Sequence, residues 1–143
     1  MATGSSFSPD EIAAMKQRQE EYNNTKGMKG AAKRAREFQA CQDAIAALEG
    51  NDRTIAERLY VIVSEVAPHL DPKTWYGFPA FAKNDKVIVW YQPASKFGTR
   101  YGNVGFSEDA AIDDGAYWPT AYAVLEVTDE LDKLLRDLVA KAA

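Results

Sequence analysis

Three segments of the chain repeat apolar residues at spacings of three and four, which is typical of helices with one buried face. They cover about residues 31–48 and 52–67 and a stretch that begins after Thr128. Their apolar stripes consist of Phe38, Cys41, Ile45 and Leu48; of Ile55, Leu59, Ile62, Val63 and Val66; and of Leu131, Leu134, Leu135, Leu138 and Val139. Asn51 or Asp52 is expected to cap the second helix, and Thr128 the last.

Another helix is predicted near the start of the chain. The residues SPDE at 8–11 combine a capping serine, a proline suited to the first helical position and a glutamate that can complete a capping box. This helix has only a thin apolar face, formed by Ile12 and Met15 with Tyr22 further on. Residues 1–7 are small and polar, and we expect them to be a flexible start.

Strands are predicted between the second apolar helix and the last one. The segment TWYGFPAFA at 74–82 indicates a strand interrupted by a glycine and a proline, and KNDK after it a hairpin turn. VIVWYQ at 87–92 is apolar on both faces, so we expect a central strand. Residues 100–106 and 120–127 complete the set, with an expected loop, ASKFGT, before them. Short turns predict one antiparallel sheet of about four strands, and the fold class is α+β.

The totals favour one soluble domain of 143 residues. We expect residues 1–50 to be a flexible start with an N-terminal helical extension, and residues 51–143 to be the α+β domain. The net charge of −4 argues against nucleic acid as the main partner. Cys41 is the only cysteine, which excludes an internal disulfide and fits the cytoplasm. There is no long apolar run and no signal-peptide pattern at the start, so a cytoplasmic protein is expected.

One basic stretch precedes and enters the first apolar helix. It contains Lys26, Lys29, Lys33, Arg34 and Arg36. Such a patch can contact nucleic acid or anionic lipid, but Glu37 follows directly and no aromatic residue interleaves, which favours a solvated helix face. The apolar stripe of the same helix also needs cover. A homodimer through the N-terminal helices is therefore a further possibility.

Six aromatic residues fall within positions 75–91, and they suggest either a core or a binding pocket. Phe78, Phe81 and Tyr91 have the placement expected of core residues. The other rings of interest lie beside glycine or proline, at bends where rings can line a pocket. The candidate ligand site consists of Trp75, Tyr76, Pro79, Lys96 and Trp118, with Lys96 as a cation for an anionic ligand group. The alternative is a purely structural role for these rings.

The acidic segment SEDAAIDDG at 107–115 is a second candidate site. Glu108, Asp109, Asp113 and Asp114 could hold Fe(II), Mn(II) or Ca(II) weakly, because carboxylate oxygens are ligands for such cations. The alternative is a solvated acidic loop. Within the segment, one helical turn is expected to begin at Ser107. The pattern does not match a calcium-binding EF-hand loop.

No motif of catalysis occurs in the sequence. Cys41 lies on a helix stripe and is expected to be a small buried apolar residue, and His69 has no evident acidic partner. Signatures of hydrolases, phosphate-binding loops and zinc proteases are absent. We therefore expect no enzyme, and acid–base chemistry by carboxylates would be the only feasible route.

The order of helix, PKTWYGFPAFAKNDKVIVWYQ, KFGTRYGNVGFS, WPTAYAVLEVTDE and terminal helix resembles the YdhG-like family of small bacterial domains of unknown function. The resemblance covers about residues 52–141, and its most specific part is TWYGFPAFA, a hairpin strand and a loop with Lys96. It implies an α+β fold with one antiparallel sheet. Some members of this family are described as frataxin-like iron chaperones, which deliver Fe(II). The resemblance therefore also implies a possible role in carrying iron.

Three hypotheses of function follow. The first is a non-enzymatic cytoplasmic binding domain that holds a small ligand or partner segment in an aromatic pocket. The second is a frataxin-like iron carrier that uses the acidic segment. The third is a protein-interaction module that acts through the N-terminal helices.

Overall fold

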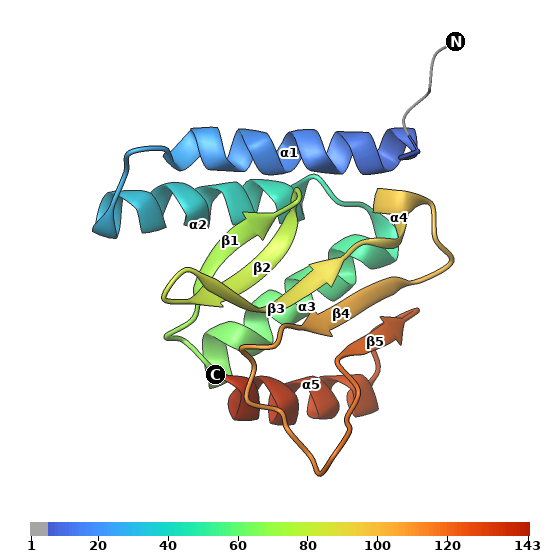
Figure 1. Ribbon diagram of the computed structural model, residues 1–143. Coiled ribbons are helices and arrows are strands. Elements are labelled where there is room, and N and C mark those ends of the chain that lie inside the picture. The colour runs from blue at the N-terminus through green and yellow to red at the C-terminus, as the bar shows by residue number, and fades with distance from the viewer. Residues whose placement is uncertain (1–5) are drawn as a thin grey trace.

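The computed structural model describes residues 6–143, and these form five helices and one sheet of five antiparallel strands (Figure 1). The helices are α1 (Pro9–Thr25), α2 (Gly30–Ala46), α3 (Gly50–Val66), α4 (Ala94–Phe97) and α5 (Asp129–Ala142). The strands are β1 (Asp71–Trp75), β2 (Phe78–Lys83), β3 (Lys86–Gln92), β4 (Gly102–Phe106) and β5 (Ala121–Val124). The predicted α+β class is confirmed, with one strand more than the four expected. Most of the expected flexible start, residues 1–5, lies outside the described residues.

The additional strand comes from the segment 74–82, which forms two strands and not one interrupted strand. The chain reverses at Tyr76 and Gly77, which have φ angles of 52° and 86°. Trp75 therefore pairs with Phe78 across a two-residue turn. Positive φ at both turn positions suits the right-handed twist of a hairpin, and glycine adopts it at no steric cost. The prediction of one interrupted strand was wrong because Tyr76 gives no sequence signal for this conformation.

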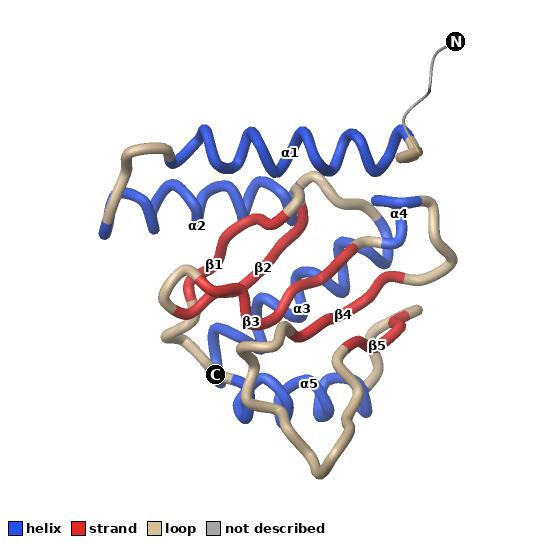
Figure 2. The backbone as a smooth tube through the Cα atoms, viewed as in Figure 1, coloured by secondary structure: helices blue, strands red, loops and turns tan. Residues whose placement is uncertain are grey.

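The strand order β1-β2-β3-β4-β5 places β3 in the middle, as its two apolar faces predicted. The turn expected at residues 83–86 is also present, with Asn84 and Asp85 at positive φ. One face of the sheet packs on α3, which crosses behind it, and α5 lies below (Figure 1). The segment between β4 and β5 is a long loop that extends below the sheet (Figure 2).

The core lies between the sheet and the helices α2, α3 and α5. Phe81, Val89, Tyr91 and Val104 point into it from three adjacent strands, and each is fully buried. The two helices α3 and α5 contribute Leu59, Ile62, Leu135 and Val139, all of which are also buried. The expected core roles of Phe81 and Tyr91 are confirmed, and Phe78 is likewise buried.

The helix α2 is part of this core and does not stand apart from the domain. Cys41 and Ile45 are buried in the same cluster, as expected for Cys41. The ammonium of Lys73 on β1 also lies 3.0 Å from the carboxylate of Glu37 on α2, with both side chains largely covered. The apolar stripe of α2 thus finds its main cover within the same chain.

The helix α1 is attached differently, because Ala14 is its only buried residue. The predicted capping box is present: the Ser8 hydroxyl accepts from the Glu11 amide at 3.1 Å, and the Glu11 carboxylate accepts from the Ser8 amide at 2.9 Å. Ile12, Met15 and Tyr22 are exposed. Local signals therefore determine where α1 begins, while burial of apolar side chains contributes little to holding it in place.

The N-cap of α3 is neither Asn51 nor Asp52, the two residues predicted to cap this helix. Its N-cap is Glu49, with no side-chain hydrogen bond to the helix. Asp52 instead accepts hydrogen bonds from the amides of Ala94 and Ser95, at 2.8 and 3.1 Å. Those residues open α4, a single helical turn in the segment that was expected to be a loop. The cap at Thr128 is confirmed, since its hydroxyl accepts from the backbone of α5.

Across residues 6–143, none of the helices combines the length and the apolar character needed to cross a membrane.

Candidate functional site: an aromatic cleft under α1

A cleft of about 370 Å³ lies under the first half of α1. Its other walls are the β1–β2 turn, the end of β3 and α4. The lining consists of Phe7, Glu11, Ala14, Met15, Trp75, Tyr76, Phe78, Trp90, Gln92 and Phe97. Eight of these ten side chains are apolar or aromatic, and Glu11 and Gln92 are the polar ones. A concave, mainly apolar cavity with few polar groups is the usual form of a small-molecule site.

Trp75 is the centre of the aromatic lining. Its ring centroid lies 5.1 Å from Tyr76, 5.2 Å from Trp90 and 6.0 Å from Phe78, and all three pairs meet edge to face. These separations fall within the range in which aromatic pairs attract each other. The hairpin positions the cluster, because it places Trp75 and Phe78 directly opposite each other. The rings therefore come from the β1–β2 hairpin and from β3, and none of them belongs to α1.

Polar contacts hold α1 over this wall. The Glu21 carboxylate accepts hydrogen bonds from the amides of Tyr76 and Gly77, at 3.0 and 2.6 Å. The ammonium of Lys96, on α4, donates to the side-chain carbonyl of Gln17. A Cβ atom on Gly77 would overlap the end of the Gln17 side chain, which would have to move to make room. The positive φ of Gly77 is the main reason for glycine at this position of the turn.

Lys96 is partly buried at this contact. Burial lowers the pKa of its ammonium, and the negative charges of Glu21 and Asp10 act against that effect. The Glu21 carboxylate therefore lies within electrostatic range of Lys96, while the hydrogen-bond partner of the ammonium is Gln17.

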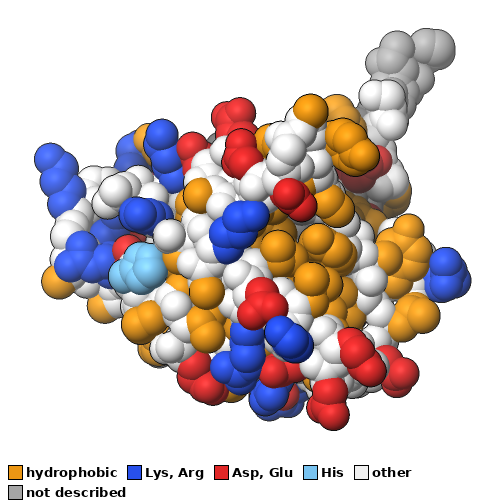
Figure 3. Space-filling view, turned by 90° about the horizontal axis from the view of Figure 1, so that it is seen from below, with side chains coloured by type: hydrophobic (Ala, Val, Ile, Leu, Met, Phe, Trp, Pro, Cys, Tyr) orange, Lys and Arg blue, Asp and Glu red, His pale blue; other side chains and the backbone are white. Residues whose placement is uncertain are grey.

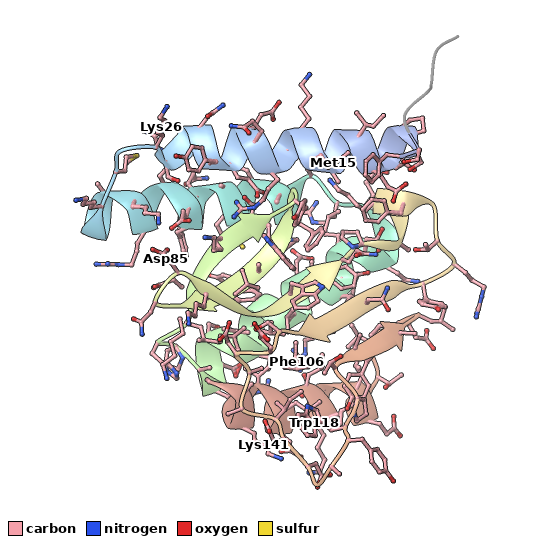
Figure 4. All side chains as sticks on the ribbon, in the orientation of Figure 1. Met15, Lys26, Asp85, Phe106, Trp118 and Lys141 are labelled. Atoms are coloured by element: carbon pink, nitrogen blue, oxygen red, sulfur yellow. The ribbon has the colours of Figure 1, made fainter. Side chains whose placement is uncertain are left out.

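The five residues of the predicted ligand site fall at four places. Trp75 and Tyr76 line the cleft, as proposed from their position at a bend. Lys96 contacts α1 beside the cleft, whereas Pro79 is fully buried within β2. Trp118 lies near α5 at the far end of the molecule from Met15, which marks the cleft (Figure 4).

Trp118 lines a separate hollow of about 390 Å³ in the loop between β4 and β5. Its neighbours there include Glu108, Asp113 and Tyr117. Tyr117 is 88% exposed, so this hollow is shallow on that side. Seen from below, the surface of the molecule has hydrophobic side chains near its middle, with charged ones around them (Figure 3).

The four acidic residues of the candidate metal site lie along this same loop. Asp109 pairs with Lys86 at 3.8 Å, and the backbone carbonyl of Asp113 accepts from Lys141 at 3.0 Å. The turn expected at Ser107 is present, but it does not continue as a helix. Among residues 6–143, no three side chains of His, Cys, Asp or Glu are grouped so that they could hold a metal ion. The iron-carrier hypothesis gains no support from this geometry.

Several residues of the cleft were not identified from the sequence. Met15 had been assigned to the thin apolar face of a helix, and Trp90 to the second face of a central strand. Phe97 lies in a segment expected to be a loop. Glu21, which binds the β1–β2 turn beside the cleft, also gave no signal, because a glutamate within a helix is ordinarily solvated. Only the packing of α1 on the hairpin brings these residues together.

Comparisons of the chain with protein-family models, with curated proteins and with solved structures found no match. The resemblance to the YdhG-like family therefore stays a prediction. The structure itself defines an α+β domain with an aromatic cleft.

Proposed function

We propose that this protein binds a small, planar, mainly apolar molecule in the aromatic cleft under α1. The observation that carries the proposal is the cluster of Trp75, Tyr76, Phe78 and Trp90 around one cavity. A volume of about 370 Å³ lies within the range of small-molecule sites. The proposed role is binding and not catalysis. A buried, lone Cys41 supports a cytoplasmic location.

The lining favours a flat ring over a flexible chain. Edge-to-face rings present both a flat π surface and a positive ring edge. The aromatic ring of a ligand can pack favourably against either one. Glu11 is engaged by the start of its own helix. The side-chain amide of Gln92 is therefore the polar group best suited to orient a bound molecule, since it offers both a donor and an acceptor.

Indole is a suitable neutral probe, and calorimetric titration measures its affinity. Trp75→Ala should weaken binding about tenfold or more, because the central ring contact is lost. Tyr117→Ala is the control: it removes an exposed aromatic residue outside the cleft, and the affinity should not change. If Trp75→Ala remains folded by circular dichroism and binds indole as the wild type does, the proposed site is wrong.

Self-association through α1 is a second candidate function. The observation in its favour is the exposure of Ile12 and Tyr22, at 44% and 59%, on a helix with one buried residue. Exposed apolar side chains on one element are a common feature of interaction surfaces. Light scattering of the wild type and of an Ile12→Ser, Tyr22→Ser double variant tests it. A monomer at all concentrations in the wild type would exclude this candidate.

A further inference from the structure

The β1–β2 turn already binds a carboxylate, and that carboxylate belongs to Glu21. The two oxygens are used separately: Oε1 accepts from the amide of Tyr76 at 3.0 Å, and Oε2 from the amide of Gly77 at 2.6 Å. Consecutive backbone amides that converge on one anion form a recurrent type of anion site. The hairpin holds these donors in place, because both residues have the positive φ angles of its turn. The donors therefore exist whether or not Glu21 occupies them.

Glu21 belongs to α1, which buries fewer residues than any other long helix among residues 6–143. α1 buries Ala14 alone, whereas α2 buries Cys41 and Ile45, and α3 and α5 bury more residues still. An element with few buried apolar contacts opens at a lower free-energy cost than the rest of the fold. The contacts of Glu21 and Gln17 with the turn and α4 are thus a large part of what holds α1 down.

The anion site and the aromatic cleft share one residue, Tyr76. Tyr76 belongs to both, since its amide binds the carboxylate and its ring lines the cleft. Trp75 is the next residue along the chain and the centre of the ring cluster. Lys96 adds a positive charge next to the turn, on the side from which Glu21 and Gln17 approach.

We propose that the ligand of the cleft is a planar aromatic carboxylate, whose carboxylate replaces that of Glu21 on the amides of Tyr76 and Gly77 while its ring lies against Trp75. This inference rests on the proposed ligand-binding function and adds the chemical class of the ligand. Glu21 then acts as an intramolecular competitor. Its displacement releases the second half of α1 from the hairpin.

Indole-3-acetate and indole-3-acetamide are matched probes, because they share a ring and differ in the charge of one group. Their affinities are measured by calorimetry for the wild type, Glu21→Ala and Glu20→Ala. Glu20 is an exposed neighbour on the same helix, so its variant controls for the change in net charge. In Glu21→Ala the acetate should bind about tenfold more tightly than in the wild type, since the competitor for charge-assisted hydrogen bonds is gone. The acetamide should gain much less, and Glu20→Ala should alter neither.

The outcomes separate this inference from the function on which it rests. If both probes bind and Glu21→Ala leaves the acetate no tighter, the cleft stands and the carboxylate site is overturned. If neither probe nor indole binds to any folded variant, the cleft itself is overturned, and the inference with it.

A second measurement covers the case in which Glu21→Ala does not fold. Amide resonances of Tyr76 and Gly77 are followed in the wild-type protein as each probe is added. The acetate should shift both resonances well beyond the shifts that the acetamide causes, because it replaces one carboxylate by another in a new position. Equal shifts with the two probes would overturn the proposal.

Discussion

The indole of Trp90 lies directly over Gly105, its partner on the neighbouring strand. A Cβ atom on Gly105 would lie 2.3 Å from Cζ2 of that indole. Directly opposed residues of antiparallel strands point to the same face of the sheet. Gly105 therefore leaves the space that the Trp90 ring needs, and this ring forms part of the wall of the aromatic cleft.

Gly105→Ala should displace the Trp90 ring and thereby change the cleft. Overpacking of this kind typically costs about 1–3 kcal/mol of unfolding free energy. We expect weaker binding of indole together with a changed tryptophan emission spectrum. Asn103→Ala on the same strand is the control, because Asn103 does not line the cleft. Normal indole affinity in a folded Gly105→Ala variant would contradict the expected role of this contact.

Asp52 joins α3 to the end of β3 through a short hydrogen-bond network. Its carboxylate accepts from the Tyr91 hydroxyl at 2.6 Å and from the amides of Ala94 and Ser95. Burial raises the pKa of Asp52, but the hydrogen bonds from Tyr91 and from the two amides outweigh it, so the pKa lies below its ordinary value. Burial and the nearby Asp52 raise the pKa of the Tyr91 hydroxyl.

Asp52→Asn should lower the unfolding free energy by about 1–3 kcal/mol at pH 7, because hydrogen bonds to a charged acceptor are weakened. A carboxylate with a lowered folded-state pKa stabilises the fold above its unfolded pKa of about 3.9, and this contribution is lost as the pH falls through the folded value. The difference between wild type and variant should therefore shrink below about pH 4. Urea unfolding at pH 7 and pH 3 measures it.

The exposed Asp114 supplies the control for this experiment. Asp114→Asn should leave the unfolding free energy within about 0.5 kcal/mol of the wild type at both pH values, as surface substitutions commonly do. A difference for Asp52→Asn that stays constant from pH 7 to pH 3 would show that the charge of Asp52 is not the cause.

Removal of α1 and removal of α2 should have very different consequences. A chain of residues 29–143 loses one buried residue, Ala14, so we expect it to fold cooperatively with a lower Tm. A chain of residues 51–143 also loses Cys41 and Ile45 from the core, together with the cover over β1. Core losses of about 2–5 kcal/mol for each large side chain are comparable to the stability of a whole domain, so it should not fold. Thermal unfolding followed by circular dichroism distinguishes the two.

The Cys41 thiol should be inert in the folded protein. It is fully buried, and burial raises its pKa to about 12, although backbone contacts from Ala80 and Lys73 act in the opposite direction. Thiolate is the reactive form, so both access and ionisation limit the reaction. A disulfide reagent at pH 8 should modify the native protein at least about a hundredfold more slowly than the urea-unfolded protein, because reaction requires opening of the core. Comparable rates would contradict this burial.

Much of the fold could be predicted from local patterns. The capping box at Ser8, the cap at Thr128 and the turn at Asn84 and Asp85 are all present. The stripes of α2, α3 and α5 supply the buried faces of these helices, although Phe38 and Leu134 are exposed. Each depends on residues near one another in the sequence. The period of apolar residues states which face is buried, and a capping side chain needs only its own helix.

The candidate site was predicted less well, because it combines residues that are far apart in the sequence. Trp75 and Tyr76 were identified from the bend at Gly77, and both line the cleft. Trp118 had the same signal from its proline neighbour but lies at another hollow. A bend in the chain can leave the ring of a neighbouring residue facing a cavity. The local sequence does not show which other elements form the walls of that cavity.

The sequence by itself determined the helices, the main turns, the central position of β3 and the α+β class, because periodicity and turn chemistry act over a few residues. Only the tertiary structure decided that Glu21 reaches the hairpin amides, that Asp52 serves α4 and not its own helix, and that α1 covers the rings. The hydrogen bonds of Glu21 and Asp52 join residues 56 and 42 positions apart, respectively. Their partners are selected by the packing of whole elements, which no local pattern encodes.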